Sequence, residues 1–229
     1  MTLKLRYPTK PFIVTQVFGI SNASYKAAGI DMTHHNGIDF IVDDDGIVNA
    51  MCEGVVTDVG FNDKAGNYVK YRTRNIYNVL GEECYVEFMY MHAEKIFAAK
   101  NQIVSANTPL MLADNTGFST GPHTHISAYR IGLDGFTRLD REYATNFCFD
   151  WQPFLQYEFE LDMKRGDRGY DVMMLQKRLS VDPTGFYGPV TQMAVFNYQL
   201  DHVSLSWVER YAYQGKYCGK KTREALNRM

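Results

Sequence analysis

Short apolar runs separated by turn residues dominate the first two thirds of the chain. Runs rich in valine, isoleucine, tyrosine and phenylalanine alternate with glycine, asparagine and aspartate, for example at 54–60, 68–71 and 85–91. Such alternation is typical of β-strands joined by turns. The pattern predicts a mainly β domain built on an antiparallel sheet.

The pattern changes after Pro153 and the acidic stretch 158–162. Apolar residues at 172, 175 and 179 follow a helical spacing, residues 190–200 repeat it, and 222–229 form a third short helical segment. Two phrases of the form Gly-x-x-Thr-x-x-Ala-apolar begin at Gly188 and Gly219, which indicates an internal duplication. The threonine of each phrase is expected to cap a helix.

These changes divide the chain into two domains. We predict a β domain at 1–156, a linker at 157–161 and a small all-α three-helix domain at 162–229.

Composition excludes several classes of function. The net charge of −2 gives no basic signature for nucleic acid. No run approaches the ~18 apolar residues of a membrane span, so membrane insertion is not expected. The N-terminal residues lack an apolar stretch and a small-residue cleavage site, so no classical signal peptide is expected. We expect a monomer.

The four cysteines, at 52, 84, 148 and 218, form no CxxC pair. A thiolate metal site is therefore not expected. We expect these cysteines to be small buried apolar residues.

The six histidines, by contrast, fall where metal ligands would be expected, at 34, 35, 92, 123, 125 and 202. Residues 37–42 read as a strand, and in an extended chain His35 and Asp39 share a face, as do His123 and His125. Two histidines and one carboxylate satisfy a catalytic zinc, which takes three protein ligands and keeps one position open.

From about residue 17 to 155 the chain resembles the zinc metallopeptidases of the LytM and lysostaphin type, the M23 family. The resemblance rests on three motifs in order: His35-Asn36-Gly37-Ile38-Asp39, Tyr90-Met91-His92 and His123-Thr124-His125. It implies that His35, Asp39 and His125 bind zinc and that His92 and His123 form the catalytic pair beside it. We expect His34 to face away from the site and His202 to be solvated.

The chemistry of these residue types agrees with the resemblance. Zinc lowers the pKa of its water to about 7 and polarises a carbonyl as a Lewis acid. A neutral histidine can take a proton from that water, and a protonated one can stabilise the oxyanion or protonate the leaving amine. The division of these roles between His92 and His123 stays open.

The chain departs from the family in two places. After Gly66-Asn67-Tyr68-Val69, relatives often carry a further histidine, where this chain has Lys70-Tyr71-Arg72-Thr73-Arg74. We expect altered substrate contacts there. Lysostaphin-type relatives also place a tyrosine shortly before the first ligand, and Tyr25 is the nearest residue of that type.

The C-terminal part resembles a peptidoglycan-binding domain of the small three-helix type. The matching segments are 165–172, 175–176, 185–191, 194–195, 198–199 and 219–226, and residues 200–214 look like an insertion. The resemblance implies a wall-binding role, in which Tyr187, Trp207, Tyr211 and Tyr213 are possible glycan contacts.

Both resemblances point to bacterial peptidoglycan as the partner. We predict a zinc-dependent endopeptidase that hydrolyses peptide bonds in its cross-links or stems. A bacteriophage endolysin, made in the host cytoplasm and reaching the wall at lysis, is the expected context; a virion-associated or an extracellular bacterial enzyme is the alternative. Two other functions stay open: a non-catalytic wall-binding regulator on a peptidase fold, and a D-Ala-D-Ala carboxypeptidase.

Overall fold

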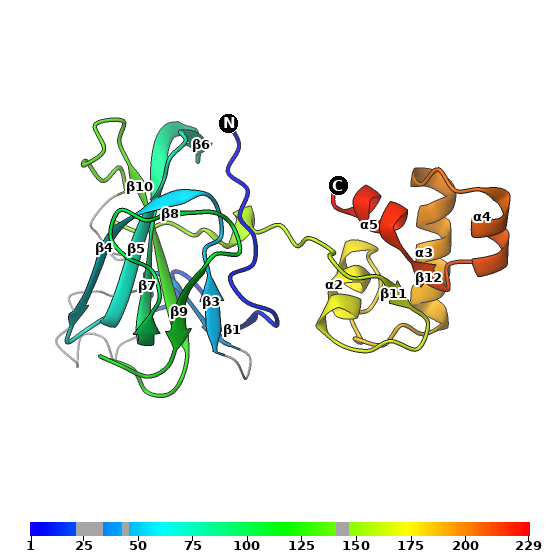
Figure 1. The fold of residues 1–229 in the computed structure, drawn as a ribbon, viewed down its shortest axis with the longest axis horizontal. Helices are drawn as coiled ribbons and strands as arrows, with labels where there is room; N and C mark the ends of the chain where they lie inside the picture. The colour runs from blue at the N-terminus through cyan, green and yellow to red at the C-terminus, as the bar shows by residue number, and fades with distance from the viewer. Residues whose placement is uncertain (22–33, 43–45, 141–146) are drawn as a thin grey trace. The chain divides into compact units, whose positions relative to one another are not determined.

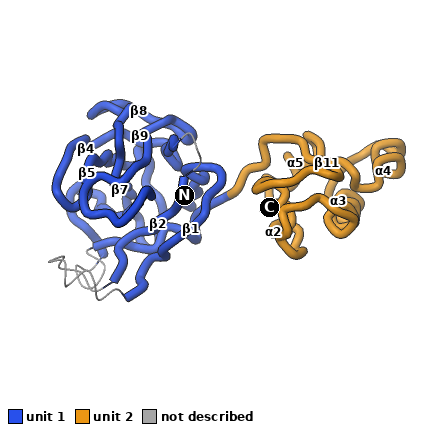
Figure 2. Tube along the Cα trace, turned by 90° about the horizontal axis from the view of Figure 1, so that it is seen from below, with its two compact units in different colours: residues 1–156 blue, residues 157–229 orange. Residues whose placement is uncertain are grey.

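The computed structural model describes residues 1–21, 34–42, 46–140 and 147–229. It divides into two compact units, Met1–Gln156 and Tyr157–Met229, coloured separately in Figure 2. Tyr25 lies outside the described residues. No helix in the described ranges is long and apolar enough to cross a membrane.

The first unit is built on an antiparallel sheet, which confirms the predicted fold class (Figure 1). The central order of strands is β1-β2-β10-β7-β5-β4-β8, with β9 paired to β3 and β7, and β6 paired to β7. The strands are β1 (Ile13–Gln16), β2 (Ile38–Ile41), β3 (Ile47–Asn49), β4 (Gly54–Asn62), β5 (Gly66–Thr73), β6 (Tyr77–Val79), β7 (Glu82–Ile96), β8 (Ile103–Val104), β9 (Pro109–Ala113) and β10 (Thr124–Ile131).

One face of this sheet carries the main core. Phe40, Phe88, Tyr90 and Ile126 are fully buried on neighbouring strands. The indole of Trp151, just before the short 3-10 helix η1 (Gln152–Phe154), packs there and donates a hydrogen bond to the Ile126 carbonyl at 2.8 Å. These core contacts hold strand β10 in place. The residues of β10 that point to the opposite face of the sheet are therefore held in defined positions.

Strand β7 contains an irregularity that the sequence pattern did not predict. His92 has φ = 66°, the left-handed region, and the pairing of β7 with β5 shifts between Asn67 and Val69. The His92 amide donates to the Ala65 carbonyl at 2.8 Å instead of joining a regular ladder. A bulge of this kind changes the direction in which a side chain points. The residue affected here, His92, is one of the two histidines predicted to be catalytic.

The second unit differs from the predicted three-helix, all-α domain. Its helices are α2 (Tyr170–Arg178), α3 (Pro189–His202), α4 (Trp207–Tyr213) and α5 (Lys220–Leu226), and β11 (Met163–Lys164) pairs with β12 (Tyr217–Cys218). The additional helix, α4, lies in the stretch that looked like an insertion. It starts with a capping box, in which Ser206 and Glu209 bond each other's backbone amides, an arrangement that stabilises a short helix.

The duplicated phrases have a different role from the one predicted. The N-caps of α3 and α5 are Gly188 and Gly219, and the threonines lie inside the helices. Both threonines are buried and accept a hydrogen bond from a buried glutamine of an earlier helix: Gln176 Nε2 to Thr191 Oγ1 is 2.8 Å and Gln199 Nε2 to Thr222 Oγ1 is 2.9 Å. The repeat is therefore one of glutamine–threonine contacts, which join α2 to α3 and α3 to α5.

The predicted linker at 157–161 is also corrected. Tyr157 and Phe159 are 3% and 2% exposed. The Phe159 amide donates to Asn227 Oδ1 at 2.8 Å, and Arg178 Nη2 donates to the Tyr157 carbonyl at 3.0 Å. The aromatic residues in this acidic stretch pack against the second unit, which makes the stretch part of it.

Candidate active site

Asp39 and His125 are brought together by strand pairing. They are direct partners in the β2–β10 ladder, and paired residues place their side chains on the same face of a sheet. His35 lies before β2, which begins at Ile38, one residue later than predicted. Its backbone is instead held by Gly19 and Ile20, through hydrogen bonds of 2.8 and 2.9 Å.

Three side-chain atoms of these residues converge. His35 Nε2 lies 3.0 Å from His125 Nδ1 and 3.2 Å from Asp39 Oδ1, and His125 Nδ1 lies 2.7 Å from that same oxygen. One ligand atom from each residue falls within 4.8 Å of the others, a spacing at which they could hold a metal ion.

The outer nitrogen of each imidazole has its own partner. His35 Nδ1 is 2.9 Å from the Val17 carbonyl, which can only accept, so this nitrogen carries the proton. His125 Nε2 is 2.8 Å from the Ser127 hydroxyl. The Ser127 hydroxyl can donate or accept; in the tautomer with the proton on His125 Nε2, both inner nitrogens turn a lone pair toward the Asp39 carboxylate. In that tautomer the two nitrogens and the carboxylate oxygen form a donor set that could hold a metal ion and that suits zinc.

The electrostatics of the three residues also favour metal binding. Burial raises the pKa of Asp39, but its contacts with the His125 and His35 rings outweigh burial and hold this pKa well below its usual range. Burial lowers the pKa of His125 despite its contact with Asp39. An ionised carboxylate and a neutral imidazole are the protonation states of metal ligands.

Gly37 is the central glycine of the first motif, and it lies against strand β10. A Cβ at this position would lie 2.5 Å from His125 Nε2 and 2.5 Å from the Ile126 carbonyl oxygen. The close approach of the chain to β10 therefore requires glycine, and it sets the His125 ring in place.

His92 and His123 lie beside the three converging residues. Their ring centroids are 4.8 Å apart, the His92 centroid is 6.3 Å from that of His125, and His123 Nε2 is 3.8 Å from Asp39 Oδ1. His92 Nδ1 donates to the Thr116 carbonyl at 2.7 Å, and His123 Nδ1 donates to the Gly121 carbonyl at 2.8 Å. Each ring therefore has Nε2 as its remaining acceptor. Burial lowers the pKa of His92 to about 4.

The Thr116 carbonyl is held against His92 by two glycines in contact. A Cβ on Gly117 would lie 2.2 Å from the Gly66 amide nitrogen, and one on Gly66 would lie 2.3 Å from Thr116 Oγ1. Both glycines have positive φ. The sequence motifs contained these glycines but did not indicate that they support His92.

The remaining sequence predictions have mixed outcomes. The Tyr90 hydroxyl donates to the Asn49 carbonyl at 3.2 Å within the core, so the tyrosine of the second motif is structural. His202 is exposed, and its ring is 4.7 Å from that of Tyr198. All four cysteines are free and buried, as expected. Ser127 and the Val17 carbonyl, which orient the two histidines, were not predicted, because no motif marks a partner of a ligand.

Comparisons with known proteins extend this picture. Residues 33–135 match the model of Peptidase family M23. An uncharacterized metalloprotease of Haemophilus influenzae is 35% identical over 102 residues, which are 44% of this chain and 19% of that protein. The peptidoglycan DD-endopeptidase ShyB of Vibrio cholerae is 33% identical over 92 residues, 40% of this chain and 20% of that protein. The matched part of the chain thus spans about a fifth of these relatives.

Among solved structures, the catalytic domain of the antimicrobial peptidase lysostaphin from Staphylococcus simulans is similar, with a TM-score of 0.48 and 20% identity. The similarity covers 62% of this chain and 91% of that domain. The residues that converge, His35, Asp39 and His125, all fall inside the matched region 33–135. Residues 33–135 of this chain are thus similar to peptidase family M23.

Proposed function

We propose that this protein is a zinc-dependent endopeptidase that hydrolyses peptide bonds in bacterial peptidoglycan. The observation that carries the proposal is the convergence of His35 Nε2, Asp39 Oδ1 and His125 Nδ1, with both outer imidazole nitrogens held by other partners. The DD-endopeptidase activity in the name of the Vibrio cholerae relative supports peptidoglycan as the substrate.

In this proposal His35, Asp39 and His125 hold the zinc ion. When bound, zinc supplies a Lewis acid and lowers the pKa of a water molecule to about 7. The three ligands contribute one negative charge, from Asp39, so a doubly charged ion keeps a net positive charge in the site.

His92 and His123 handle protons and developing charge. His92 is neutral at pH 7 because burial lowers its pKa to about 4, so its free Nε2 can accept a proton from the attacking water. His123 Nε2 lies 3.8 Å from the Asp39 carboxylate. When protonated, it can donate to the oxyanion or to the leaving amine.

We further propose that the second unit binds the wall. Tyr187, one of the aromatic residues considered as a glycan contact, is fully buried and its hydroxyl donates to the Gly215 carbonyl at 2.7 Å, so it belongs to the core. Trp207, Tyr211 and Tyr213 are 75%, 47% and 50% exposed on or at the end of α4. Exposed rings suit the apolar faces of sugars, and a unit held on the wall raises the concentration of cleavable bonds around the other.

More specifically, we propose that the protein is a bacteriophage endolysin. This is supported by the presence, in one chain, of an M23-like region and a second unit that resembles a wall-binding domain. It predicts that bacteria producing the protein in the cytoplasm lyse only when their inner membrane is permeabilised. Lysis of such cells without permeabilisation would oppose it.

The function is tested by mass spectrometry of muropeptides after incubation of purified peptidoglycan with the zinc-loaded protein. We expect new fragments that disappear with a zinc chelator and with His35→Ala, and their masses identify the bond. Fragments bearing a new internal amine indicate an endopeptidase, whereas release of free D-alanine indicates a carboxypeptidase. Unchanged muropeptides, with binding to the wall retained, would favour a regulatory role.

A further inference from the structure

A row of charged side chains occupies the same face of the sheet as the metal site. Ser127 pairs with Met89 in the β10–β7 ladder, and Met89 pairs with Lys70 in the β7–β5 ladder. Paired side chains point to one face, and His125 precedes Ser127 by two residues on β10. Lys70 therefore shares the face of His125.

Lys70 is about 12 Å from His125. The two residues are two strands apart and two residues apart along the strand direction; at ~4.8 Å between strands and ~3.3 Å per residue this gives about 12 Å between their Cα atoms. An extended peptide covers about 12 Å in three to four residues. A peptide that is cleaved at the metal site can therefore contact Lys70 through a residue three to four positions from the cleaved bond.

The Lys70 ammonium is positioned without an ion pair in the described structure. Its Nζ lies 5.4 Å from the centroid of the Tyr68 ring, and no carboxylate in the described ranges lies within 4.0 Å of it. The Tyr68 hydroxyl donates to Asp58 Oδ2 at 2.9 Å, which holds the ring in place and occupies one oxygen of that carboxylate. Lys70 is half-buried, so a carboxylate that reaches it gains a partly shielded partner.

Arg72 extends the positive charge along β5. It follows Lys70 by two residues on the same face, and its guanidinium lies 5.5 Å from the Tyr85 ring. Its cross-strand partner Glu87 accepts a hydrogen bond from Thr57 at 2.9 Å. The run that replaces the family's usual histidine thus presents two cations, Lys70 and Arg72, toward the side of the sheet that carries the metal site.

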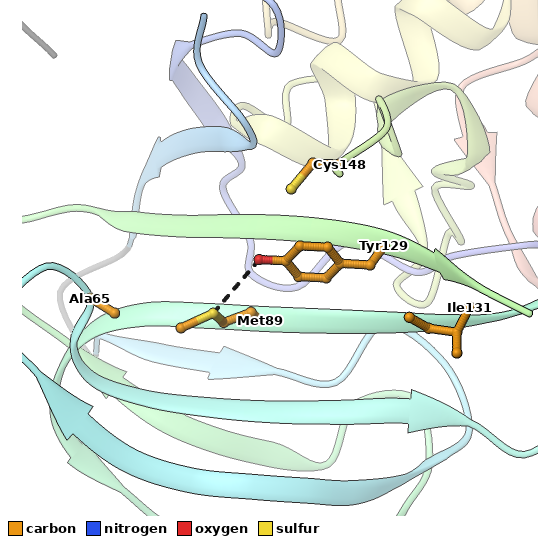
Figure 3. Close-up of a cluster of buried hydrophobic side chains, with 5 residues drawn as sticks. All are labelled: Ala65, Met89, Tyr129, Ile131 and Cys148. Atoms are coloured by element: carbon orange, nitrogen blue, oxygen red, sulfur yellow. Dashed lines mark hydrogen bonds between the residues drawn. The ribbon is translucent and has the colours of Figure 1, made fainter. Parts of the chain in front are cut away.

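On strands β7 and β10, between these cations and strand β2, part of the face is packed and apolar. Figure 3 shows the Tyr129 hydroxyl reaching the sulfur of Met89, at 3.8 Å, in a buried cluster with Ala65, Ile131 and Cys148. The Arg138 guanidinium covers the Tyr129 ring at 3.7 Å. Lys70 and Arg72 share this face with the carboxylates of their cross-strand partners, Asp58 and Glu87.

We infer that Lys70 is a specificity-determining residue that binds a carboxylate of the substrate peptide, three to four residues from the bond that is cleaved. The substrate class is then a peptide with a free acidic group, and an amidated or uncharged peptide is a poorer substrate. A charge-assisted hydrogen bond from the ammonium provides the preference. The inference rests on the proposed endopeptidase function.

The test uses the full-length, zinc-loaded protein and one soluble muropeptide in two forms, with free carboxylates and with the same groups converted to carboxamides. We expect wild type to cleave the carboxylate form with a kcat/KM about tenfold higher. Lys70→Met should remove most of this preference, chiefly through a higher KM for the carboxylate form, and Lys70→Arg should retain it. Lys100→Met, at an exposed lysine in the turn before β8, is the matched control.

The outcomes separate this inference from the function on which it rests. Equal cleavage of the two forms by wild type, or an equal loss on both forms in Lys70→Met, overturns the role of Lys70 and leaves the endopeptidase standing. Failure of the zinc-loaded wild type to cleave either form overturns the endopeptidase and the inference with it. Zinc content and thermal unfolding of each variant establish that it is folded.

Discussion

Ser127 offers a specific test of how the metal site is organised. Its hydroxyl lies 2.8 Å from His125 Nε2, and both residues are buried. Ser127→Ala removes the acceptor of the outer imidazole proton. A buried donor left without a partner costs about 1–3 kcal/mol. The ring is then free to present the wrong nitrogen to the metal.

We expect Ser127→Ala to weaken zinc binding by about 10–100-fold, as is usual for partners of ligating histidines. This is about 1.4–2.8 kcal/mol at 1.4 kcal/mol per tenfold. The assay is competition for zinc with a chromophoric chelator, with the absorption spectrum of the cobalt-substituted protein as a second report on ligand geometry.

Thr124 provides a matched control on the same strand. It is fully buried, flanks His125 on the other side, and its hydroxyl is without a hydrogen-bond partner in the described structure. Thr124→Val removes a buried hydroxyl at nearly constant volume and should leave zinc affinity within about twofold, because nothing depends on that hydroxyl. Equal affinities of Ser127→Ala and wild type, or an equal loss in both variants, would refute the reasoning.

Three further predictions concern other parts of the protein. Gly37→Ala should lower the free energy of unfolding by about 1–3 kcal/mol, because the added Cβ meets the His125 ring at 2.5 Å; urea denaturation measures this, and an unchanged midpoint would contradict the close approach. His92→Asn, in which asparagine tolerates the left-handed backbone at φ = 66°, should retain one zinc ion but lower kcat by about 10²–10⁴-fold; wild-type turnover of muropeptides by this variant would exclude His92 from proton transfer. Trp207→Ala combined with Tyr211→Ala should reduce co-sedimentation with peptidoglycan several-fold while leaving cleavage of soluble muropeptides unchanged; undiminished co-sedimentation would move the wall contact away from α4.

Much of the first unit could be predicted from the sequence because its signals are local. Alternating apolar residues identified the strands, and the resemblance to M23 peptidases implied the ligand set His35, Asp39 and His125, whose side-chain atoms the structure brings together. Strand β2 starts at Ile38, one residue later than predicted, and His35 precedes it. Its position comes from backbone contacts with residues 19 and 20, which alternation cannot reveal.

The features that could not be predicted depend on contacts between distant residues. His92 adopts its left-handed conformation where its amide donates to the Ala65 carbonyl, and the neighbouring Gly66 packs against Gly117, 51 positions away in the sequence. In the second unit, the threonines of the repeat had the right composition for N-caps, but the glycines cap the helices and the threonines bond to buried glutamines. Capping by threonine and capping by glycine are both compatible with the local propensities of these residues. The packing between helices determines which of the two forms.

The central claim is that one zinc ion, held by His35, Asp39 and His125, drives cleavage of peptidoglycan. The most direct measurement is a titration of the metal-free protein with zinc, following release of muropeptides at each step. We predict that activity rises in proportion to zinc, saturates at one equivalent, and is not restored in His125→Ala. Full activity in the metal-free protein, or recovery in His125→Ala at one equivalent, would contradict the account.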